Sequence, residues 1–385
     1  MKFSGYRRPD GRAGVRNHVL ILPTVSCSCR AAAGIASLVR GCVTFSHQHG
    51  CAQVGADKEQ TFRTLVGLGA HPNVYGTIVV GLGCEVIEPE AVRDAIRDHG
   101  KPVQMITVQE AGGTIEAIAR GARLAAEMAI EASTARRAEC PVSDLILGTE
   151  CGGSDACSGL SANPALGHAC DALSEHGATI ILAETTELIG AEHLLAQRAC
   201  TPSVAGRCVE IVKRIEDGAF KMGVDMRGTQ PSPGNIRGGI TTIEEKSLGC
   251  IHKAGKGPVN EVIEYAGRPT RKGIVVMDTP GMDVDQLVGM VAGGAQIVVF
   301  TTGRGNPLGS PIVPVIKVAS NSGTFSGMRD NMDINAGTIV EGPETVASVG
   351  DAIAREVLAV CDGKLTRSEV LGHDEFGIYR IGPTL

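Results

Sequence analysis

The sequence predicts an α/β protein with two doubly wound (Rossmann-like), mainly parallel sheet domains covered by helices. Short runs rich in Val and Ile alternate with amphipathic helical patterns, which is the order of elements in parallel βαβ units. With 385 residues, the chain is longer than one hydrophobic core usually serves. It has no Trp and 51 Gly, so we expect small aliphatic side chains packed in close layers, as in helix-covered sheets.

The first series of predicted strands comprises residues 18–24, 42–46, 76–83 and 103–108. Amphipathic helical patterns separate these strands. A further helical pattern covers residues 113–137 and ends in a charged, alanine-rich stretch that could link or cross domains. We therefore predict a boundary near Glu139, with one domain in residues 1–138 and a second, catalytic domain in residues 139–385.

The second series of predicted strands comprises residues 144–148, 179–183, 273–278 and 295–301. Helical patterns separate most of them. The stretch 228–256 is different, because its Pro and Gly residues interrupt any periodicity until a helical pattern resumes at 241–253. A long loop of this kind is usually functional.

Composition excludes several classes of partner. The net charge is about −6, and basic residues are scattered without aromatic neighbours, so a nucleic-acid partner is not expected. No apolar run approaches the roughly 20 residues of a membrane span, and residues 1–10 lack the apolar core of a signal peptide. We expect a cytoplasmic protein. Its 13 cysteines, an odd number in a long chain, predict reduced thiols, some of them metal ligands.

Cysteines follow several of the predicted strands. Cys27, Cys51 and Cys84 follow the first three, Cys151 follows the first strand of the second series, and Cys29 is a further candidate. Ligands of open parallel sheets bind beyond the carboxyl ends of the strands, and thiolates favour iron, iron–sulfur clusters or zinc. We predict iron, as Fe²⁺ or as a cluster, with Mn²⁺ as an alternative. Because no CxxC pair is present, small buried thiols without a metal remain the other interpretation.

Three further features carry ionisable groups. His47 and His49 lie two residues apart after the second strand, where either could bind a metal or act as a base near neutral pH. Lys246 follows two glutamates near a helix start and is either a solvated ion-pairing residue or a base or carboxylate clamp. Arg304, between two glycines at a strand end, is either a surface residue or a bidentate partner for a substrate carboxylate.

Two polar segments are candidates for substrate binding. The turn at residues 150–155, which contains Gly153, Ser154 and Asp155, precedes a helix and can hold an anion on its amides. The segment 231–246, which contains Asn235 and Thr241, combines rigid turns with groups suited to hydroxyls and a carboxylate. The sequence lacks GxxxxGK[ST], a GxGxxG run after the first strand and GxSxG, which disfavours common nucleotide-binding and serine-hydrolase sites.

Several motifs point to one family. They are Gly5-Tyr6, Asp10-Gly11-Arg12, Gly14-Val15-Arg16-Asn17, Gly81-Leu82-Gly83-Cys84-Glu85, Cys-Gly-Gly-Ser-Asp at 151–155, Pro233-Gly234-Asn235, Gly238–Thr242, Glu245–Gly249 and Thr301–Gly305. Over nearly the whole chain, the sequence resembles the altronate/galactarate dehydratase family. The resemblance implies a lyase (hydro-lyase) of carbohydrate catabolism that uses iron to dehydrate an aldonate or aldarate sugar acid to a 2-keto-3-deoxy acid.

The resemblance also implies a separate small subunit. Single-chain members carry a small N-terminal domain ahead of the Gly-Tyr-x-Arg-x-Asp-Gly-Arg motif, which here begins at Gly5. The branch that resembles sulfolactate sulfo-lyase shares this two-subunit layout and expels sulfite instead of water. Because Cys27, Cys51 and Cys84 agree with the sugar-acid branch, we rank altronate-like dehydration first and (2R)-sulfolactate lysis second. The third alternative is a non-catalytic sugar-acid-binding subunit. We also expect a homo-oligomer.

Loss of a proton α to a carboxylate needs a metal or cation to stabilise the enediolate. We expect iron near Cys27, Cys51 and Cys84, with Cys151 as a further ligand, to bind the carboxylate or the leaving hydroxyl. The predicted roles of the other residues are base for His49 or Lys246, proton donor to the leaving group for His47 or Asp155, and substrate binding for Arg304, Asn235, Thr241, Ser154 and Gly153.

Overall fold

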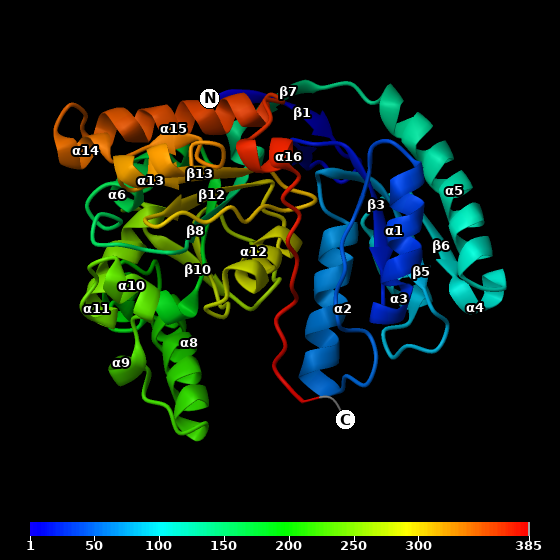
Figure 1. Ribbon diagram of the computed structural model, residues 1–385, viewed down its shortest axis with the longest axis horizontal. Helices are drawn as coiled ribbons and strands as arrows, with labels where there is room; N and C mark the ends of the chain where they lie inside the picture. The colour runs from blue at the N-terminus through cyan, green and yellow to red at the C-terminus, as the bar shows by residue number, and fades with distance from the viewer. Residues whose placement is uncertain (384–385) are drawn as a thin grey trace.

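The computed structural model describes residues 1–383. It confirms an α/β fold with parallel sheets covered by helices (Figure 1). The smaller parallel sheet has the strand order β4-β3-β5-β6, and its strands match the four predicted for the first series to within a few residues. Their bounds are β3 (His18–Pro23), β4 (Cys42–Thr44), β5 (Val74–Gly81) and β6 (Val103–Thr107).

Helices cover both faces of this sheet. The apolar sides of α1 (Cys29–Leu38) and α5 (Thr114–Thr134) pack with Val19 and Ile21. The apolar sides of α2 (Gly55–Gly69) and α3 (Pro89–Asp98) pack with Leu20 and Leu22 on the opposite face, because successive side chains of a strand point in opposite directions. The helix predicted at 113–137 is α5. The short helices of this region are η1 (Ser26–Ser28) and α4 (Val108–Ala111).

The larger sheet has seven parallel strands in the order β10-β11-β9-β8-β12-β13-β14. All four strands predicted for the second series are present, as β8, β9, β11 and β12. The patterns did not predict β10, β13 or β14. The bounds are β8 (Ile146–Cys151), β9 (Thr179–Leu182), β10 (Val259–Ile263), β11 (Gly273–Met277), β12 (Ile297–Thr302), β13 (Val315–Ala319) and β14 (Ile334–Asn335).

Each face of the larger sheet has its own core. On one face, α6 (Ala162–Glu175), α8 (Pro202–Lys221) and α15 (Val346–Cys361) contribute to one apolar cluster. On the other face, α12 (Asp283–Ala292) joins a cluster that also contains residues of α2 and the smaller sheet. The two sheets therefore share a core. The remaining helices are η2 (Val142–Asp144), η3 (Thr185–Leu188), α7 (Glu192–Gln197), α9 (Met226–Thr229), α10 (Pro233–Arg237), α11 (Ile243–Cys250), η4 (Ile251–Ala254), α13 (Ser322–Gly327), α14 (Thr338–Glu341) and α16 (Arg367–Leu371).

A third sheet was not predicted. In it, β1 (Lys2–Arg7) pairs antiparallel with β2 (Ala13–Gly14) and with β7 (Ala138–Pro141). The N-terminal strand thus lies beside the segment that follows α5, at the top of Figure 1. Glu139, near which we placed the domain boundary, lies in β7 and pairs with Ser4.

The C-terminal segment lies between the part of the molecule built on the smaller sheet and the part built on the larger sheet. It runs there as an extended chain, red in Figure 1. The Phe376 ring stacks on Phe45 with centroids 3.8 Å apart, and Gln60 Nε2 donates to Tyr379 O at 2.8 Å. These contacts attach the segment to the smaller sheet and α2, although it follows the larger sheet in sequence.

The stretch 228–256 is a chain of short helices. Each begins at a residue whose side chain accepts a backbone N–H: Asp225 caps α9, Ser232 caps α10 and Thr242 caps α11. Glycines interrupt the stretch between α10 and α11. The periodicity predicted for 241–253 corresponds to α11 and η4.

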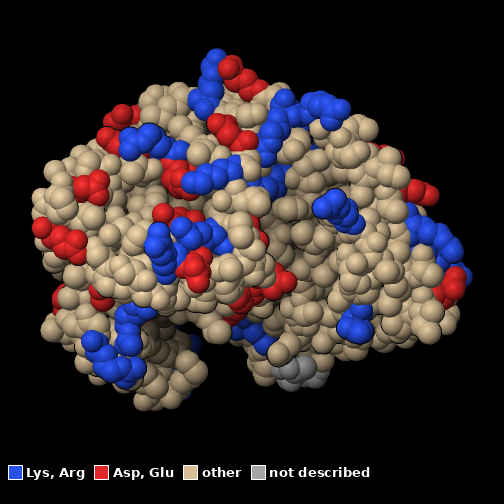
Figure 2. All heavy atoms as spheres, turned by 45° about the horizontal axis from the view of Figure 1, so that its top comes forward, with Lys and Arg blue, Asp and Glu red and all other residues tan. Residues whose placement is uncertain are grey.

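Two features of the described chain concern membrane and nucleic-acid binding. Within residues 1–383, no helix is long and apolar enough to cross a membrane. On the face drawn in Figure 2, Lys and Arg side chains lie interspersed with Asp and Glu side chains. This face therefore presents no single basic surface of the kind that binds the phosphates of nucleic acid.

Buried histidines predict a pH dependence of stability. Burial lowers the pKa of His47 to about 4, below the value of about 6.5 in an unfolded chain. The unfolded state therefore binds more protons between these values, so the free energy of unfolding should fall as pH decreases from 6.5 to 4. Urea unfolding across this range measures the slope. A His47→Gln variant should show a smaller slope than the parent protein, and equal slopes would contradict the assignment to His47.

Candidate functional site

Polar side chains converge around a cavity of about 450 Å³ at the carboxyl ends of the larger sheet's strands. Its walls come from the loops after β8, β9, β11 and β12, and from α9, α10 and α11. Open parallel sheets bind ligands at this edge. We call it the large cavity. It is lined by Cys151, Gly152, Gly153, Glu184, Thr186, Met226, Gln230, Ser232, Gly234, Asn235, Arg237, Ile243, Lys246, Gly281, Asp283 and Arg304.

Below this cavity, two lysines hold one buried carboxylate. Lys253 Nζ lies 2.7 Å from Glu187 Oε2, and both side chains are fully buried. Lys246 Nζ lies 3.1 Å from Glu187 Oε1 and 3.8 Å from Glu184 Oε1. Burial alone would raise the pKa of Glu187, but the ammonium groups of Lys253 and Lys246 lower it below its usual value. Glu187 is therefore an ionised carboxylate at neutral pH.

Lys246 is held in its protonated form. Burial opposes this by lowering its pKa, but the carboxylates of Glu187 and Glu184 raise the pKa of Lys246 above its usual value. The Lys246 side chain is 15% exposed and lines the large cavity. It therefore presents a firmly protonated ammonium to any molecule bound there.

Three other carboxylates crowd together beside this ion pair. One oxygen from each of Glu150, Glu184 and Asp283 lies within 4.8 Å of the others. Both Glu150 oxygens and Glu184 Oε2 are buried without a hydrogen-bond partner in the described chain. Burial first, and then neighbouring negative charges, raise the pKa values of all three groups. Such carboxylates take up protons more readily than exposed ones.

Glu184 has an unusual backbone. Its φ of 69° is in the left-handed region, which costs free energy for a residue other than glycine. The loop holds this conformation, because Glu184 N–H donates to Thr279 Oγ1 at 2.6 Å. Backbone strain of this kind concentrates at functional sites. Here it accompanies a carboxylate that lines the large cavity.

A buried lysine faces the carboxylates from below. Lys317 Nζ lies 3.5 Å from the centroid of the Phe300 ring and has no hydrogen-bond partner in the described chain. Burial lowers the pKa of Lys317 to about 7, although Glu150 and Asp283 oppose that shift. Lys253, Lys246 and Lys317 thus lie close enough to these carboxylates to oppose the rise in their pKa values.

Five of the predicted site residues line the large cavity. Arg304 Nη1 donates to Gly234 O at 2.7 Å, which places the guanidinium over α10. Asn235 Nδ2 donates to Ser154 O at 2.9 Å, which joins α10 to the loop after β8. The structure thus brings together residues from Cys151 to Arg304, which are 153 positions apart in sequence. The five are Cys151, Gly153, Asn235, Lys246 and Arg304.

Three other predicted residues lie near the large cavity without lining it. Ser154 and Asp155 line a second cavity of about 240 Å³. The Asp155 carboxylate accepts from Ser158, Ser320 and Asn321 at 2.7–2.9 Å, so it joins the loops after β8 and β13. Thr241 donates from N and Oγ1 to Glu245 Oε2, an exposed contact beside the first turn of α11.

The other predicted metal ligands belong to the smaller sheet. Cys27, Cys51 and Cys84 are exposed and follow β3, β4 and β5. Their loops are hydrogen-bonded to one another, as Ser26 N–H donates to His49 O at 2.9 Å and Val86 N–H to Gly50 O at 3.0 Å. Cys151 belongs to the larger sheet and lies apart from that group. The described chain has two groups with three potential ligand atoms within 4.8 Å, and neither contains Cys27, Cys51 or Cys84.

The two predicted histidines contact backbone. His47 Nε2 lies 2.9 Å from Pro23 O, and His47 Nδ1 accepts from His49 N–H at 3.1 Å. His49 Nε2 lies 2.9 Å from Ile378 O, whereas His49 Nδ1 is buried without a partner in the described chain. His47 therefore uses both ring nitrogens to hold the loop between β4 and α2, and His49 keeps one free. Their catalytic roles stay predictions.

Sequence reasoning assigned no role to five charged residues around the cavity. Glu184 and Glu187 follow a correctly predicted strand, so their position at a strand end was the available signal. Lys253 lies seven residues after Lys246, two helical turns along the pattern at 241–253, which places both on one side. Asp283 and Lys317 gave no comparable signal, because Asp283 begins a helix and Lys317 lies within a strand that the apolar pattern did not reveal.

Comparisons with known proteins match nearly the whole chain. Residues 142–384 match the family model described as D-galactarate/altronate dehydratase, C-terminal. Residues 5–133 match the model described as D-galactarate dehydratase/altronate hydrolase, second domain. The chain is 39% identical to the (2R)-sulfolactate sulfo-lyase subunit beta of Chromohalobacter salexigens, over 98% of this chain and 97% of the relative.

Two longer relatives are dehydratases. The altronate dehydratase of Bacillus subtilis is 36% identical over 100% of this chain and 78% of the relative. The galactarate dehydratase (L-threo-forming) of Escherichia coli is 36% identical over 99% of this chain and 77% of the relative. The match to the sulfo-lyase subunit therefore extends over a larger share of the relative than either of these.

Proposed function

The chain belongs to the D-galactarate/altronate dehydratase family, and on this basis we propose that it is a lyase that eliminates a group β to the carboxylate of a small 2-hydroxy acid. One observation of the structure carries the proposal. The large cavity combines the cations of Arg237, Arg304 and Lys246 with Glu184, a buried carboxylate whose pKa is raised. Opposite charges of this kind suit a reaction that removes a proton and stabilises the resulting anion.

We place (2R)-sulfolactate first among the substrates and a sugar acid such as altronate or galactarate second. This reverses the order that the sequence motifs suggested. The chain is 39% identical to the sulfo-lyase subunit and 36% identical to each of the two dehydratases. In addition, two arginines and a lysine around one cavity favour a substrate with two anionic groups over altronate, which has one. Sulfolactate carries a carboxylate and a sulfonate, and galactarate carries two carboxylates.

We assign substrate binding to the loop after β12 and to α10. Arg304 provides a guanidinium for a carboxylate or sulfonate. Arg237, at the other end of α10, provides a second cation in the cavity wall. Asn235 is already fixed by its bonds to Ser154 O and Ser232 Oγ, so it shapes the wall between them. A 2-hydroxy acid thus lies between two anion-binding groups.

The acid–base roles follow from the opposite pKa shifts of neighbouring groups. Glu184 lines the cavity with an unpartnered Oε2, and we assign it removal of the α proton. Lys246 keeps its proton at Nζ, so we assign it stabilisation of the negative charge on the substrate carboxylate. Loss of the leaving group from the β carbon then gives an enol, which becomes pyruvate from sulfolactate or a 2-keto-3-deoxy acid from a sugar acid.

We assign iron to the loops of the smaller sheet, where Cys27, Cys51 and Cys84 would hold it. Two observations support this fit. These thiols are free and exposed on loops that bond to one another, and His49 Nδ1, on the same loops, is a buried atom without a partner in the described chain. Three thiolates suit an iron–sulfur cluster with one open iron. When bound there, an iron with an open position would supply a Lewis acid.

Replacement of Cys84 by Ser should lower iron content and activity together. We expect roughly a tenfold loss or more, since even changes around metal ligands cost about 10–100-fold. The measurement is iron and acid-labile sulfide per chain after anaerobic purification, beside the elimination rate. Cys200→Ser, at another exposed cysteine, is the matched control and should change neither. Full iron and full activity in the Cys84→Ser protein would exclude Cys84 as a ligand.

We also propose a separate small subunit as partner. The sulfo-lyase relative that the chain matches over 97% of its length is itself named a subunit beta. Assays of the proposed function therefore use the chain together with the proposed small subunit. A homo-oligomer remains a prediction from the sequence.

The proposed function is tested by supplying (2R)-sulfolactate, altronate and galactarate to the anaerobically purified assembly. Sulfite and pyruvate in equal amounts from sulfolactate would support the first substrate. A 2-keto acid without sulfite from altronate or galactarate would support the second class. Binding of these acids without any turnover, in protein loaded with iron and the small subunit, would reject the lyase and favour a sugar-acid-binding subunit.

A further inference from the structure

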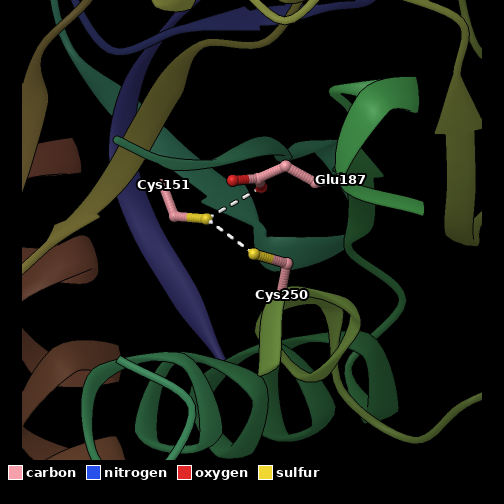
Figure 3. A group of neighbouring side chains, drawn as sticks. All are labelled: Cys151, Glu187 and Cys250. Carbon is pink, nitrogen blue, oxygen red and sulfur yellow. Dashed lines mark hydrogen bonds between the residues drawn. The ribbon is translucent and has the colours of Figure 1, made fainter. Parts of the chain in front are cut away.

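Two cysteines meet beneath the large cavity. Cys151 ends β8 and Cys250 ends α11, and their sulfur atoms lie 3.3 Å apart (Figure 3). Both side chains are about 2% exposed. A disulfide needs about 2.05 Å between the sulfurs, so the pair is little more than 1 Å from bonding distance. In residues 1–383, no other two cysteine sulfurs lie in hydrogen-bonding contact.

The two thiols have different surroundings. Cys151 Sγ donates to Glu187 Oε2 at 2.8 Å and accepts from Lys253 Nζ at 3.3 Å. Its proton therefore points at a carboxylate oxygen. Burial, followed by the contact with Cys151, raises the pKa of the Cys250 thiol. Cys151 is thus equipped to react first, and Cys250 is placed to react with it second.

Both cysteines lie in cavity walls. Cys151 lines the large cavity, and Cys250 lines the second cavity. Lys246 lies in the walls of both, so the two cavities meet at this lysine. The exposed cysteines lack a partner thiol in hydrogen-bonding contact, and their oxidation would give other products.

We propose that Cys151 and Cys250 form a site of reversible oxidation by hydroperoxides. The Cys151 sulfur attacks one peroxide oxygen, the O–O bond breaks, and the thiol proton is transferred to the departing oxygen, which leaves as water from hydrogen peroxide. The Cys250 sulfur then attacks the sulfenic acid at Cys151 and releases a second water. Two thiols and one peroxide thus give one disulfide and two waters, and a thiol reductant restores the starting state.

The disulfide should also stop elimination, a consequence that rests on the proposed function. Bond formation removes the hydrogen bond from Cys151 to Glu187, which also holds Lys246 and Lys253. It also pulls on α11, the helix that carries Lys246. Both changes displace the charged groups of the cavity wall.

The test treats the reduced assembly with one equivalent of hydrogen peroxide under anaerobic conditions, blocks free thiols with iodoacetamide and maps the peptides by mass spectrometry. We expect a cross-linked peptide pair joining Cys151 and Cys250, two hydrogens lighter than the separate peptides and removed by dithiothreitol. Cys250→Ala should abolish the pair. Cys170→Ala, at another buried cysteine, is the matched control and should leave it intact.

The outcomes separate this inference from the proposed function. A reduced protein that turns over substrate but gives no Cys151–Cys250 peptide, with oxidation only at the exposed cysteines, overturns the inference and leaves the function standing. A cross-link in a protein without lyase activity does the reverse. If Cys250→Ala fails to fold, the peptide map of the parent protein decides alone, because it identifies the bonded residues directly.

Discussion

Replacement of Glu184 by Gln should lower kcat by about 10²–10⁴-fold, the usual contribution of a general base. The amide keeps the size of the side chain but cannot accept the α proton. KM should change little, because the cations Arg304 and Lys246 remain in the cavity wall. Steady-state kinetics with the acid that the assembly turns over, among sulfolactate, altronate and galactarate, provides the measurement.

A pH profile adds a second readout for Glu184. Burial and the nearby Glu187 raise the pKa of Glu184, and the base must be ionised to act. The acid limb of kcat/KM should therefore fall at a higher pH than an ordinary carboxylate would give. Glu244→Gln, a change in the first turn of α11 outside the cavity lining, is the control. Near-normal kcat in Glu184→Gln would assign the base elsewhere.

Replacement of Lys253 by Met should lower the free energy of unfolding by about 3–5 kcal/mol. This is the usual cost of removing one partner from a buried ion pair, because the remaining charge is left poorly compensated. Glu187 and Lys253 are both fully buried, and Lys246 alone would then balance Glu187. Urea denaturation followed by circular dichroism measures the difference.

A double variant distinguishes ion pairing from simple packing. Lys253→Met combined with Glu187→Met removes both charges and should regain part of the lost stability. Lys256→Met, at an exposed lysine three residues further on, should change stability by less than about 0.5 kcal/mol. A double variant as unstable as the sum of its single variants would show that the two side chains do not act as a pair.

Local pattern was sufficient for most of the sheets. Eight strands were predicted from short runs of Val and Ile, because strands buried on both faces are apolar at nearly every position. The pattern did not predict β13, because Lys317 interrupts the apolar run that would have marked this strand. The patterns did not predict β1 and β7 either. These two strands pair across more than 130 residues, and pairing at that distance leaves no periodic signal in the sequence.

The sequence by itself determined the family, the helix-covered parallel sheets and the edge of each sheet where reactive residues collect. The order of the strands within each sheet depends on how those elements pack together. The tertiary structure alone decided which charged groups meet. It placed Lys253 in contact with Glu187 and Cys151 in contact with Cys250, and it formed the hydrogen bonds from Ser320 and Asn321 to Asp155. The reason is that charge, burial and proton affinity depend on neighbours in space, which loops and helices between distant strands bring together.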